Sequence, residues 1–143
     1  MKLSFKTVNN GDQLPEVVRE TNQEIMWRHA VTSFDWNPVH INPDWCRTAK
    51  VFGLESTVMH GNLAFSLITS VVTNWAYPAG GRISKLDIKL LKPVPPGSTI
   101  RYGGAVTEKH PIEAGKNFVV VEIYGKNQDD ETIAAATAEV ILP

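Results

Sequence analysis

Residues 61–75, GNLAFSLITSVVTNW, decide the fold, because they are apolar around most of a helical circumference. The apolar members are Leu63, Ala64, Phe65, Leu67, Ile68, Val71, Val72 and Trp75. A helix of this kind is usually buried on several sides rather than laid on a surface. Gly61 begins the run, and the segment YPAGG at 77–81 ends it. We therefore predict a central helix that the rest of the chain must cover.

The chain after this helix has the texture of β-strands. Apolar residues alternate with polar ones at 86–90, and the turn PVPPG follows at 93–97. Further strands are predicted over 100–106, 118–124 and 132–142. Four antiparallel strands wrapped around one apolar helix are an economical way to bury it, so the predicted class is α+β.

The chain before the central helix predicts smaller elements. Residues 2–8 are expected to form a short strand, closed by a turn at 9–12. The segment TNQE at 21–24 has the form of a capping box, with Thr21 as N-cap of a helix running to about Val31. Asn42 is expected to cap a second short helix over 43–50.

Composition limits the class of protein. A chain of 143 residues is one domain's worth, and its net charge of -1 gives no positive field for nucleic acid. The single cysteine, Cys46, excludes an intrachain disulfide. No signal peptide is recognisable, and the apolar stretch at 63–72 is too short to span a bilayer. We expect a cytoplasmic protein with no membrane partner.

The segment DWNPVH at 35–40 carries the candidate chemistry. Asp35 and His40 lie in a loop that Asn37-Pro38 must fold after a helix, so both side chains can face one small space. Together they can hold a water and take its proton, and Asn37 can orient either group. On spacing alone, ordinary loop hydrogen bonds and a partly buried histidine are the commoner interpretation.

His60-Gly61 adds a second candidate element. The first N–H groups of a helix are unpaired and lie at the positive end of its dipole. A glycine there lets a substrate oxygen approach closely, which favours an oxyanion site. Taken alone, a glycine chosen for turn geometry is again the commoner explanation.

Together these segments resemble a known family. DWNPVH resembles the D-x-N-P-x-H signature of the MaoC-like family, the R-specific enoyl-CoA hydratases and (3R)-hydroxyacyl-ACP dehydratases. Three further segments match in family order: GDQLP at 11–15, the pair FG at 52–53 with HG at 60–61, and KPVPPG at 92–97. The six-residue signature is fairly specific, and the others are weak singly but informative in sequence.

The resemblance implies one hot-dog domain over residues 1–143, with residues 61–75 as its central helix. It implies that Asp35 and His40 are the catalytic pair and that the Gly61 N–H polarises a thioester carbonyl. Asn37 and His60 would support them, and Thr69 would hydrogen-bond Asp35. The expected reaction is reversible hydration of trans-2-enoyl thioesters to (3R)-3-hydroxyacyl thioesters, in fatty acid metabolism.

The resemblance implies no metal and no cofactor beyond CoA or phosphopantetheine as the substrate's carrier. It also implies a homodimer or higher homo-oligomer, with a heterodimer as the alternative. Candidate substrate contacts are Trp36, Asn62, Arg82 and Lys85. Asn62 stands where the family usually has methionine, and a solvated strand face is the simpler explanation of Arg82 and Lys85.

Two rival functions remain open on sequence. A hot-dog thioesterase usually has a carboxylate on or just before the central helix. Residues 61–75 contain neither Asp nor Glu, and Glu55 is the nearest upstream. A non-catalytic half of a heteromeric dehydratase usually lacks the Asp/His pair, so the presence of both residues favours the catalytic half.

Overall fold

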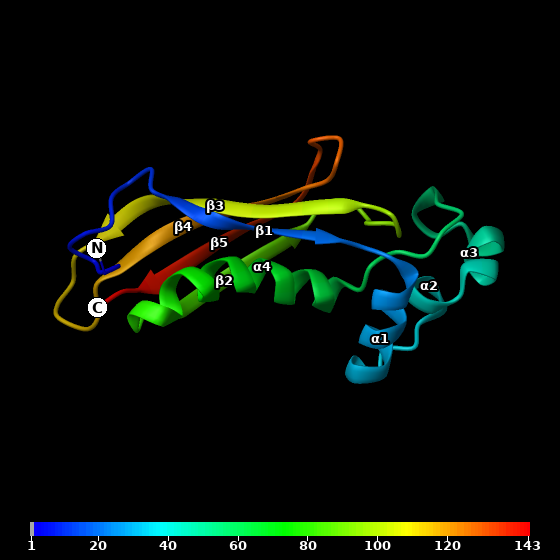
Figure 1. Ribbon diagram of the computed structural model, residues 1–143, viewed down its shortest axis with the longest axis horizontal. Coiled ribbons are helices and arrows are strands. Elements are labelled where there is room, and N and C mark those ends of the chain that lie inside the picture. The colour runs from blue at the N-terminus through cyan, green and yellow to red at the C-terminus, as the bar shows by residue number, and fades with distance from the viewer. Residues whose placement is uncertain (1) are drawn as a thin grey trace.

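The computed structural model describes residues 2–143 as a sheet with a long helix against one face and short helices at one end (Figure 1). The strands are β1 (Gln13–Glu20), β2 (Arg82–Leu90), β3 (Thr99–His110), β4 (Phe118–Lys126) and β5 (Thr132–Ile141). The helices are α1 (Gln23–Ser33), α2 (Pro38–Ile41), α3 (Pro43–Ala49) and α4 (Gly61–Ala76), with 3-10 turns η1 (Val51–Gly53) and η2 (Tyr77–Ala79).

The sheet is antiparallel, with strand order β1-β3-β4-β5-β2. Helix α4 lies along it and contacts β1, β2, β3 and β5 (Figure 1). This arrangement confirms the α+β prediction and is the hot-dog fold that the resemblance implies. The predicted central helix at 61–75 is one residue longer, and each of the later strands is found at its predicted place.

The core lies between α4 and the sheet. One face of the helix is fully covered, and the inward positions of the strands meet it. The helix contributes Ala64, Ile68, Val71, Val72 and Ala76; the facing strands contribute residues such as Ile100, Val106, Val119, Val121, Ala138 and Val140. Alternation in β4, where Val119, Val121 and Ile123 are buried, places the intervening residues on the other face.

The predicted strand at 2–8 is wrong. Residues 5–7 form a turn, where the Phe5 N–H donates to the Pro143 carbonyl at 2.8 Å. The first strand lies instead at 13–20, and it contains Pro15. Proline cannot donate to a strand ladder, but β1 is an edge strand, and its register shifts between Leu14 and Val17. This bulge at the edge is where a sheet tolerates proline.

The predicted capping box is also wrong by one residue. Asn22 is the N-cap of α1, and its side chain accepts from the Ile25 N–H at 2.9 Å. Thr21 is buried and donates its hydroxyl to the carbonyls of Pro95 and Ser98, 3.1 and 3.0 Å away. Thr21 therefore ties the start of α1 to the turn before β3. The predicted cap at Asn42 is confirmed, with Trp45 N as donor at 3.0 Å.

Among residues 2–143, no helix is both long and apolar enough to cross a lipid bilayer.

Candidate active site

The segment that carries Asp35, Asn37 and His40 leaves α1 and folds back at once into α2. Phe34 ends α1 in the left-handed conformation, at φ 56°. The Asn37 side chain then caps α2, accepting from the Val39 N–H at 3.1 Å. Pro38 begins this short helix, where its missing N–H costs nothing. His40 is therefore held on a helical turn rather than in the loop that the sequence predicts.

The predicted pair meets. His40 Nε2 lies 3.8 Å from Asp35 Oδ2, too far for a direct hydrogen bond. A single water can hydrogen-bond both atoms across this distance. The His40 side chain is 13% exposed and that of Asp35 38%, so the pair lies at a boundary between interior and solvent.

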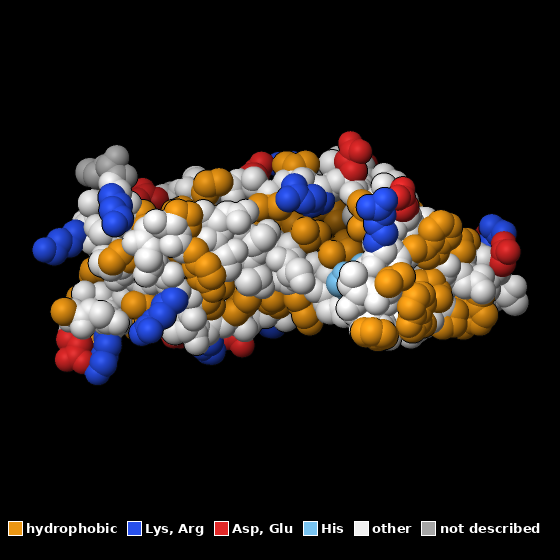
Figure 2. Space-filling model, turned by 60° about the horizontal axis from the view of Figure 1, so that its bottom comes forward, with side chains coloured by type: hydrophobic (Ala, Val, Ile, Leu, Met, Phe, Trp, Pro, Cys, Tyr) orange, Lys and Arg blue, Asp and Glu red, His pale blue; other side chains and the backbone are white. Residues whose placement is uncertain are grey.

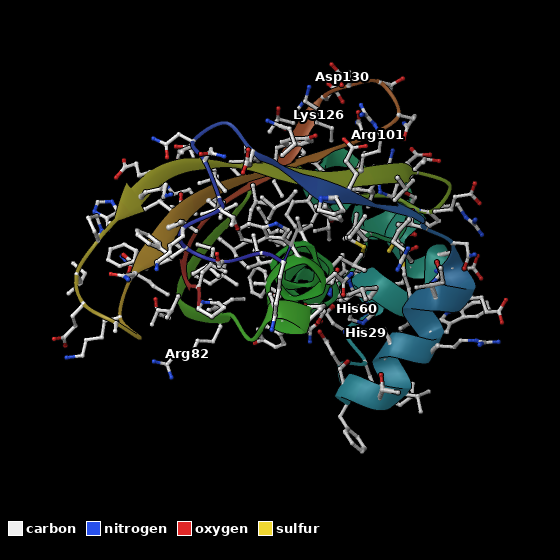
Figure 3. The ribbon with its side chains drawn as sticks, turned by 60° about the vertical axis from the view of Figure 1, so that its left-hand side comes forward. His29, His60, Arg82, Arg101, Lys126 and Asp130 are labelled. Carbon is white, nitrogen blue, oxygen red and sulfur yellow. The ribbon has the colours of Figure 1, made fainter. Side chains whose placement is uncertain are left out.

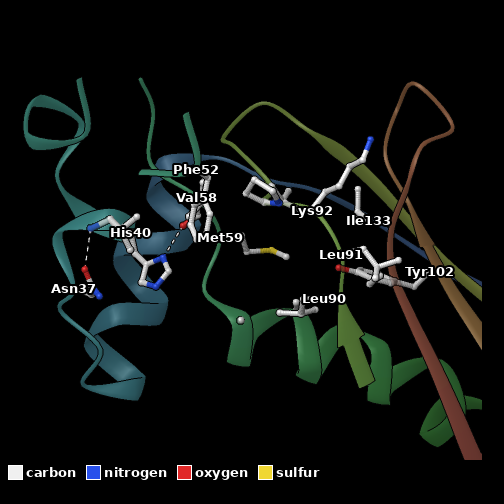
Figure 4. A pocket seen from close by; sticks show the side chains of 16 residues that line it. Asn37, His40, Phe52, Val58, Met59, Leu90, Leu91, Lys92, Tyr102 and Ile133 are labelled. Carbon is white, nitrogen blue, oxygen red and sulfur yellow. Dashed lines mark hydrogen bonds between the residues drawn. The ribbon is translucent and has the colours of Figure 1, made fainter. Parts of the chain in front are cut away.

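The tautomer of His40 is determined by its other ring nitrogen. Nδ1 lies 2.7 Å from the Val58 carbonyl oxygen (Figure 4). A carbonyl can only accept, so Nδ1 carries the proton and Nε2 of the neutral ring has its lone pair free. The His40 backbone is held as well, because Gln23 Nε2 donates to its carbonyl at 2.8 Å, and the Thr57 hydroxyl donates to Gln23 Oε1. Sequence reasoning missed these supports, which come from backbone carbonyls and distant side chains.

His60 is completely buried behind the pair. Its ring stacks on His40 with centroids 4.0 Å apart and 24° between planes, and His29 meets it edge-on at 4.8 Å. Its Nε2 lies 3.2 Å from the Asp35 carbonyl, so Nε2 carries the proton. Burial lowers the pKa of His60, and the neighbouring histidines lower it further. His60 is therefore neutral and joins Asp35 to His40.

A metal ion is the other chemistry that this cluster suggests. Ligand atoms of Asp35, His40 and His60 lie within 4.8 Å of one another. The two rings are stacked, however, with 24° between their planes, so their nitrogens lie in two nearly parallel layers. His60 Nε2 already faces the Asp35 carbonyl. The arrangement fits acid–base work better than coordination.

A cavity of about 460 Å³ opens beside the pair. It is lined mainly by apolar side chains, with His40 and Asn37 at one end (Figure 4), and Gly61 also lines it. The apolar wall includes Val39, Phe52, Val58, Met59, Ala64, Leu90, Leu91, Val94, Tyr102 and Ile133. Its size and polarity are those of a small-molecule site with a few polar groups at one end.

Gly61 starts α4 as predicted. His60 occupies the N-cap position, and its side chain caps no N–H. The first N–H groups of α4 are therefore not satisfied by a capping side chain, and Gly61 itself lines the cavity. A β-carbon at Gly61 would lie 3.3 Å from the Leu90 side chain, so a larger residue would crowd this end of the cavity.

Three other predicted site residues lie away from the cavity. The Thr69 hydroxyl donates to the Phe65 carbonyl in its own helix at 2.7 Å, which is a correction to its expected bond with Asp35. Asn62 Oδ1 contacts His29 Nε2 at 2.7 Å, and Trp36 is 53% exposed. None of the three lines the cavity.

Arg82 and Lys85 also lie outside the cavity of this chain. Arg82 pairs in register with Ile141 near the chain end and points away from His60 (Figure 3). Lys85 forms an ion pair with Asp87 at 3.2 Å on the exposed face of β2. The simpler explanation, a solvated strand face, agrees with these positions. Lys92, at the cavity rim, is the cation that the structure brings to the site.

A family model described as "MaoC like domain" matches residues 5–127. The mouse (Mus musculus) peroxisomal multifunctional enzyme type 2 is 35% identical over 81 residues, 56% of this chain, which spans 10% of that enzyme. A mitochondrial 3-hydroxyacyl-[acyl-carrier-protein] dehydratase of Arabidopsis thaliana is 27% identical over 148 aligned positions, covering 98% of this chain and 84% of the relative.

A solved structure of similar shape is that of R-hydratase PhaJ1 from Pseudomonas aeruginosa. Its TM-score is 0.84 at 22% identity, over 99% of this chain and 86% of that one. The (R)-hydratase from A. caviae has a TM-score of 0.79 at 20% identity, over 96% and 99% of the two chains. These relatives are named hydratases or dehydratases, which are hydro-lyases. The family model covers most of the length of this chain, which therefore belongs to the MaoC-like domain family.

Proposed function

We propose that this protein is a hydro-lyase that reversibly adds water to a trans-2-enoyl thioester, giving the (3R)-3-hydroxyacyl thioester. The observation that carries the proposal is that Asp35 Oδ2 lies 3.8 Å from the free Nε2 of His40, a residue that lines the polar end of an apolar cavity. Membership of a family with named hydratases and dehydratases supports it.

The proposed reaction begins with one water held between Asp35 and His40. The water oxygen bonds to the β-carbon of the enoyl group, and its proton passes to one of these two side chains. The thioester oxygen gains negative charge, which the unpaired N–H groups at the start of α4 stabilise. A proton then goes to the α-carbon, so that H and OH are both added. Dehydration runs through the same steps in reverse.

The test is a spectrophotometric assay that follows loss of enoyl absorbance with crotonyl-CoA and longer trans-2-enoyl-CoAs. Asp35→Asn and His40→Ala should each abolish activity, while circular dichroism and the unfolding temperature show that both variants fold. His110→Gln, at the opposite end of the sheet from α4's first turn, is the matched control and should retain activity. Full activity in either site variant would overturn the mechanism.

A thioesterase is the competing enzyme function. Its usual carboxylate is absent from α4, and Glu55 makes an ion pair with Lys50 at 2.7 Å with its side chain 64% exposed. Neither Glu55 nor Lys50 lines the cavity. The same assay with a thiol reagent separates the two functions. Thioester cleavage removes the enoyl thioester absorbance and releases free CoA, whereas hydration removes the absorbance and releases no thiol.

A homodimer is the assembly that we propose. Apolar side chains are exposed over α1 to α3 and beside the cavity, where Figure 2 shows them gathered at one end of the molecule. Within this surface the largest exposures are Phe34 82%, Phe52 67%, Val31 56%, Leu91 54% and Trp36 53%. A contiguous surface of this kind is typical of an interaction site. Solved relatives include the ChsH1-ChsH2 and HadBC complexes, so light scattering of the purified chain must distinguish a homodimer from a monomer that needs a partner.

A further inference from the structure

Tyr102 places a polar atom in an otherwise apolar wall. It lies on β3, its side chain is completely buried, and it lines the cavity. Its hydroxyl is closed off from solvent and has no hydrogen-bond partner within residues 2–143. Burial raises the pKa of Tyr102 to about 12, so the phenol keeps its proton. The Tyr102 hydroxyl is therefore a neutral hydrogen-bond donor without an acceptor among the described residues.

A phenylalanine would fill the same space without leaving a polar atom unpaired. The ring itself is closely held, because a β-carbon at Gly125 on the neighbouring strand would lie 2.6 Å from its Cε1. The absence of a side chain at Gly125 gives the ring its room. Figure 4 shows the hydroxyl at the end of the ring that faces the cavity, with Met59 extending towards it from the other side.

The position of Tyr102 indicates which part of a substrate would meet it. Phe52, Leu91 and Lys92 are exposed and form the rim of the cavity, whereas Tyr102 is fully buried. A water-soluble carrier such as CoA stays at the rim, and the acyl chain occupies the interior. Met59, an unbranched and adaptable side chain, can change rotamer as a chain enters. The hydroxyl would then face the acyl chain.

The charge around Tyr102 limits the chemistry of that chain. The lining contains one cation, Lys92, and its amine is paired with Glu131 at 2.6 Å. A carboxylate on the acyl chain would therefore be buried without a free counter-ion, which is costly. A neutral oxygen, in contrast, accepts one hydrogen bond from the phenol and needs no counter-ion.

We propose that Tyr102 is a specificity residue that donates its O–H to a neutral oxygen on the acyl chain, beyond the reacting carbons. The preferred substrates would then be enoyl thioesters whose chain carries an ether, keto or hydroxyl oxygen at one position. This inference rests on the proposed hydration of enoyl thioesters, and it adds the class of acyl group.

The test uses a medium-chain trans-2-enoyl-CoA and a series of analogues in which one methylene at a time is replaced by an ether oxygen. An ether can accept but not donate, and it changes the chain length little. With wild-type protein, one position in the series should give a kcat/KM well above its neighbours. Tyr102→Phe should lose about tenfold on that analogue and nothing on the hydrocarbon chain.

Tyr124→Phe is the matched control. Tyr124 lies on β4, and its hydroxyl already donates to Glu16 at 2.7 Å on the exterior. This variant should keep the wild-type preference. A preference that survives in Tyr102→Phe, or a flat series with wild-type protein, would overturn the inference.

Two further measurements separate this inference from the reaction itself. Saturated acyl-CoAs and their ether analogues cannot be hydrated, so calorimetric titration measures the same preference as a ratio of Kd values. If no enoyl thioester is hydrated, the proposed function fails, but the binding ratio still decides the role of Tyr102. Tyr102→Phe should also unfold at the wild-type temperature or above it; a lower temperature would mean that the hydroxyl has a partner in the folded chain.

Discussion

The substitution His60→Phe tests how the active site is held together. It keeps a flat ring at a fully buried position but removes the bond from Nε2 to the Asp35 carbonyl, 3.2 Å long. One such hydrogen bond contributes about 0.5–1.5 kcal/mol to stability, so the variant should remain folded. The backbone of Asp35 would then no longer be hydrogen-bonded to a buried side chain, so Asp35 could shift. A displacement of about 1 Å at a catalytic group can lower the rate roughly 100-fold.

The expected kinetic effect of His60→Phe is therefore a fall in kcat of about 10- to 100-fold. The KM should change little, because His60 does not line the cavity. The hydration assay with crotonyl-CoA measures both constants. A loss confined to KM, or wild-type kcat, would refute the positioning role of His60.

The pH dependence of stability provides an independent readout. Burial lowers the pKa of His60 below the ordinary histidine value of 6.5, so the unfolded chain takes up a proton before the folded chain does. Wild-type stability should fall as the pH drops below 6.5, by at most about 1.4 kcal/mol per pH unit for one proton. His60→Phe lacks this group, so its urea unfolding curves should depend less on pH. An unchanged difference between the two proteins from pH 8 to pH 5 would contradict this reasoning.

Three further predictions concern the frame around the site. Asn22→Ala removes the cap of α1 and should cost about 1 kcal/mol in urea unfolding, and no loss would show that the bond to Ile25 N–H contributes nothing. Gly104→Ala should destabilise by about 1–3 kcal/mol, since its β-carbon would lie 2.7 Å from the Glu122 carbonyl oxygen; an unchanged unfolding temperature would contradict this. Burial raises the pKa of the Cys46 thiol, so a thiol reagent should label it in urea but only slowly in the native protein, and equally fast labelling would show an open α3.

Strand β1, which the sequence analysis missed, shows where local patterns stop being informative. Alternation is clearest in β4, where Val119, Val121 and Ile123 are buried in the core and the residues between them are more exposed. In β1, only Leu14 and Val17 are buried, and a bulge separates them, so no regular alternation marks the strand. Pro15 lies within this edge strand, and a proline is more typical of a turn than of a strand. The pairing of β1 with β3 is a contact between segments far apart in the sequence, so no local pattern predicts it.

The shift of the helix cap from Thr21 to Asn22 has a similar origin. Both residues can cap a helix, so local chemistry allows either. The hydroxyl of Thr21 is used by the carbonyls of Pro95 and Ser98, which lie more than 70 positions away in the chain. Tertiary packing therefore decided between two locally equal caps.

The central helix could be predicted from the sequence alone, because a helix that is apolar around most of its circumference must pack against the rest of the chain. It also placed Asp35, Asn37 and His40 in one short folded segment, where the spacing and the proline bring the side chains together. Only the tertiary structure decided what these groups can do. The Val58 carbonyl selects the tautomer of His40, burial keeps His60 neutral behind it, and Tyr102, 62 positions after His40, reaches the cavity from β3. These contacts join segments that approach one another only when the sheet closes around α4. They therefore cannot be predicted from the residues that neighbour each group in the sequence.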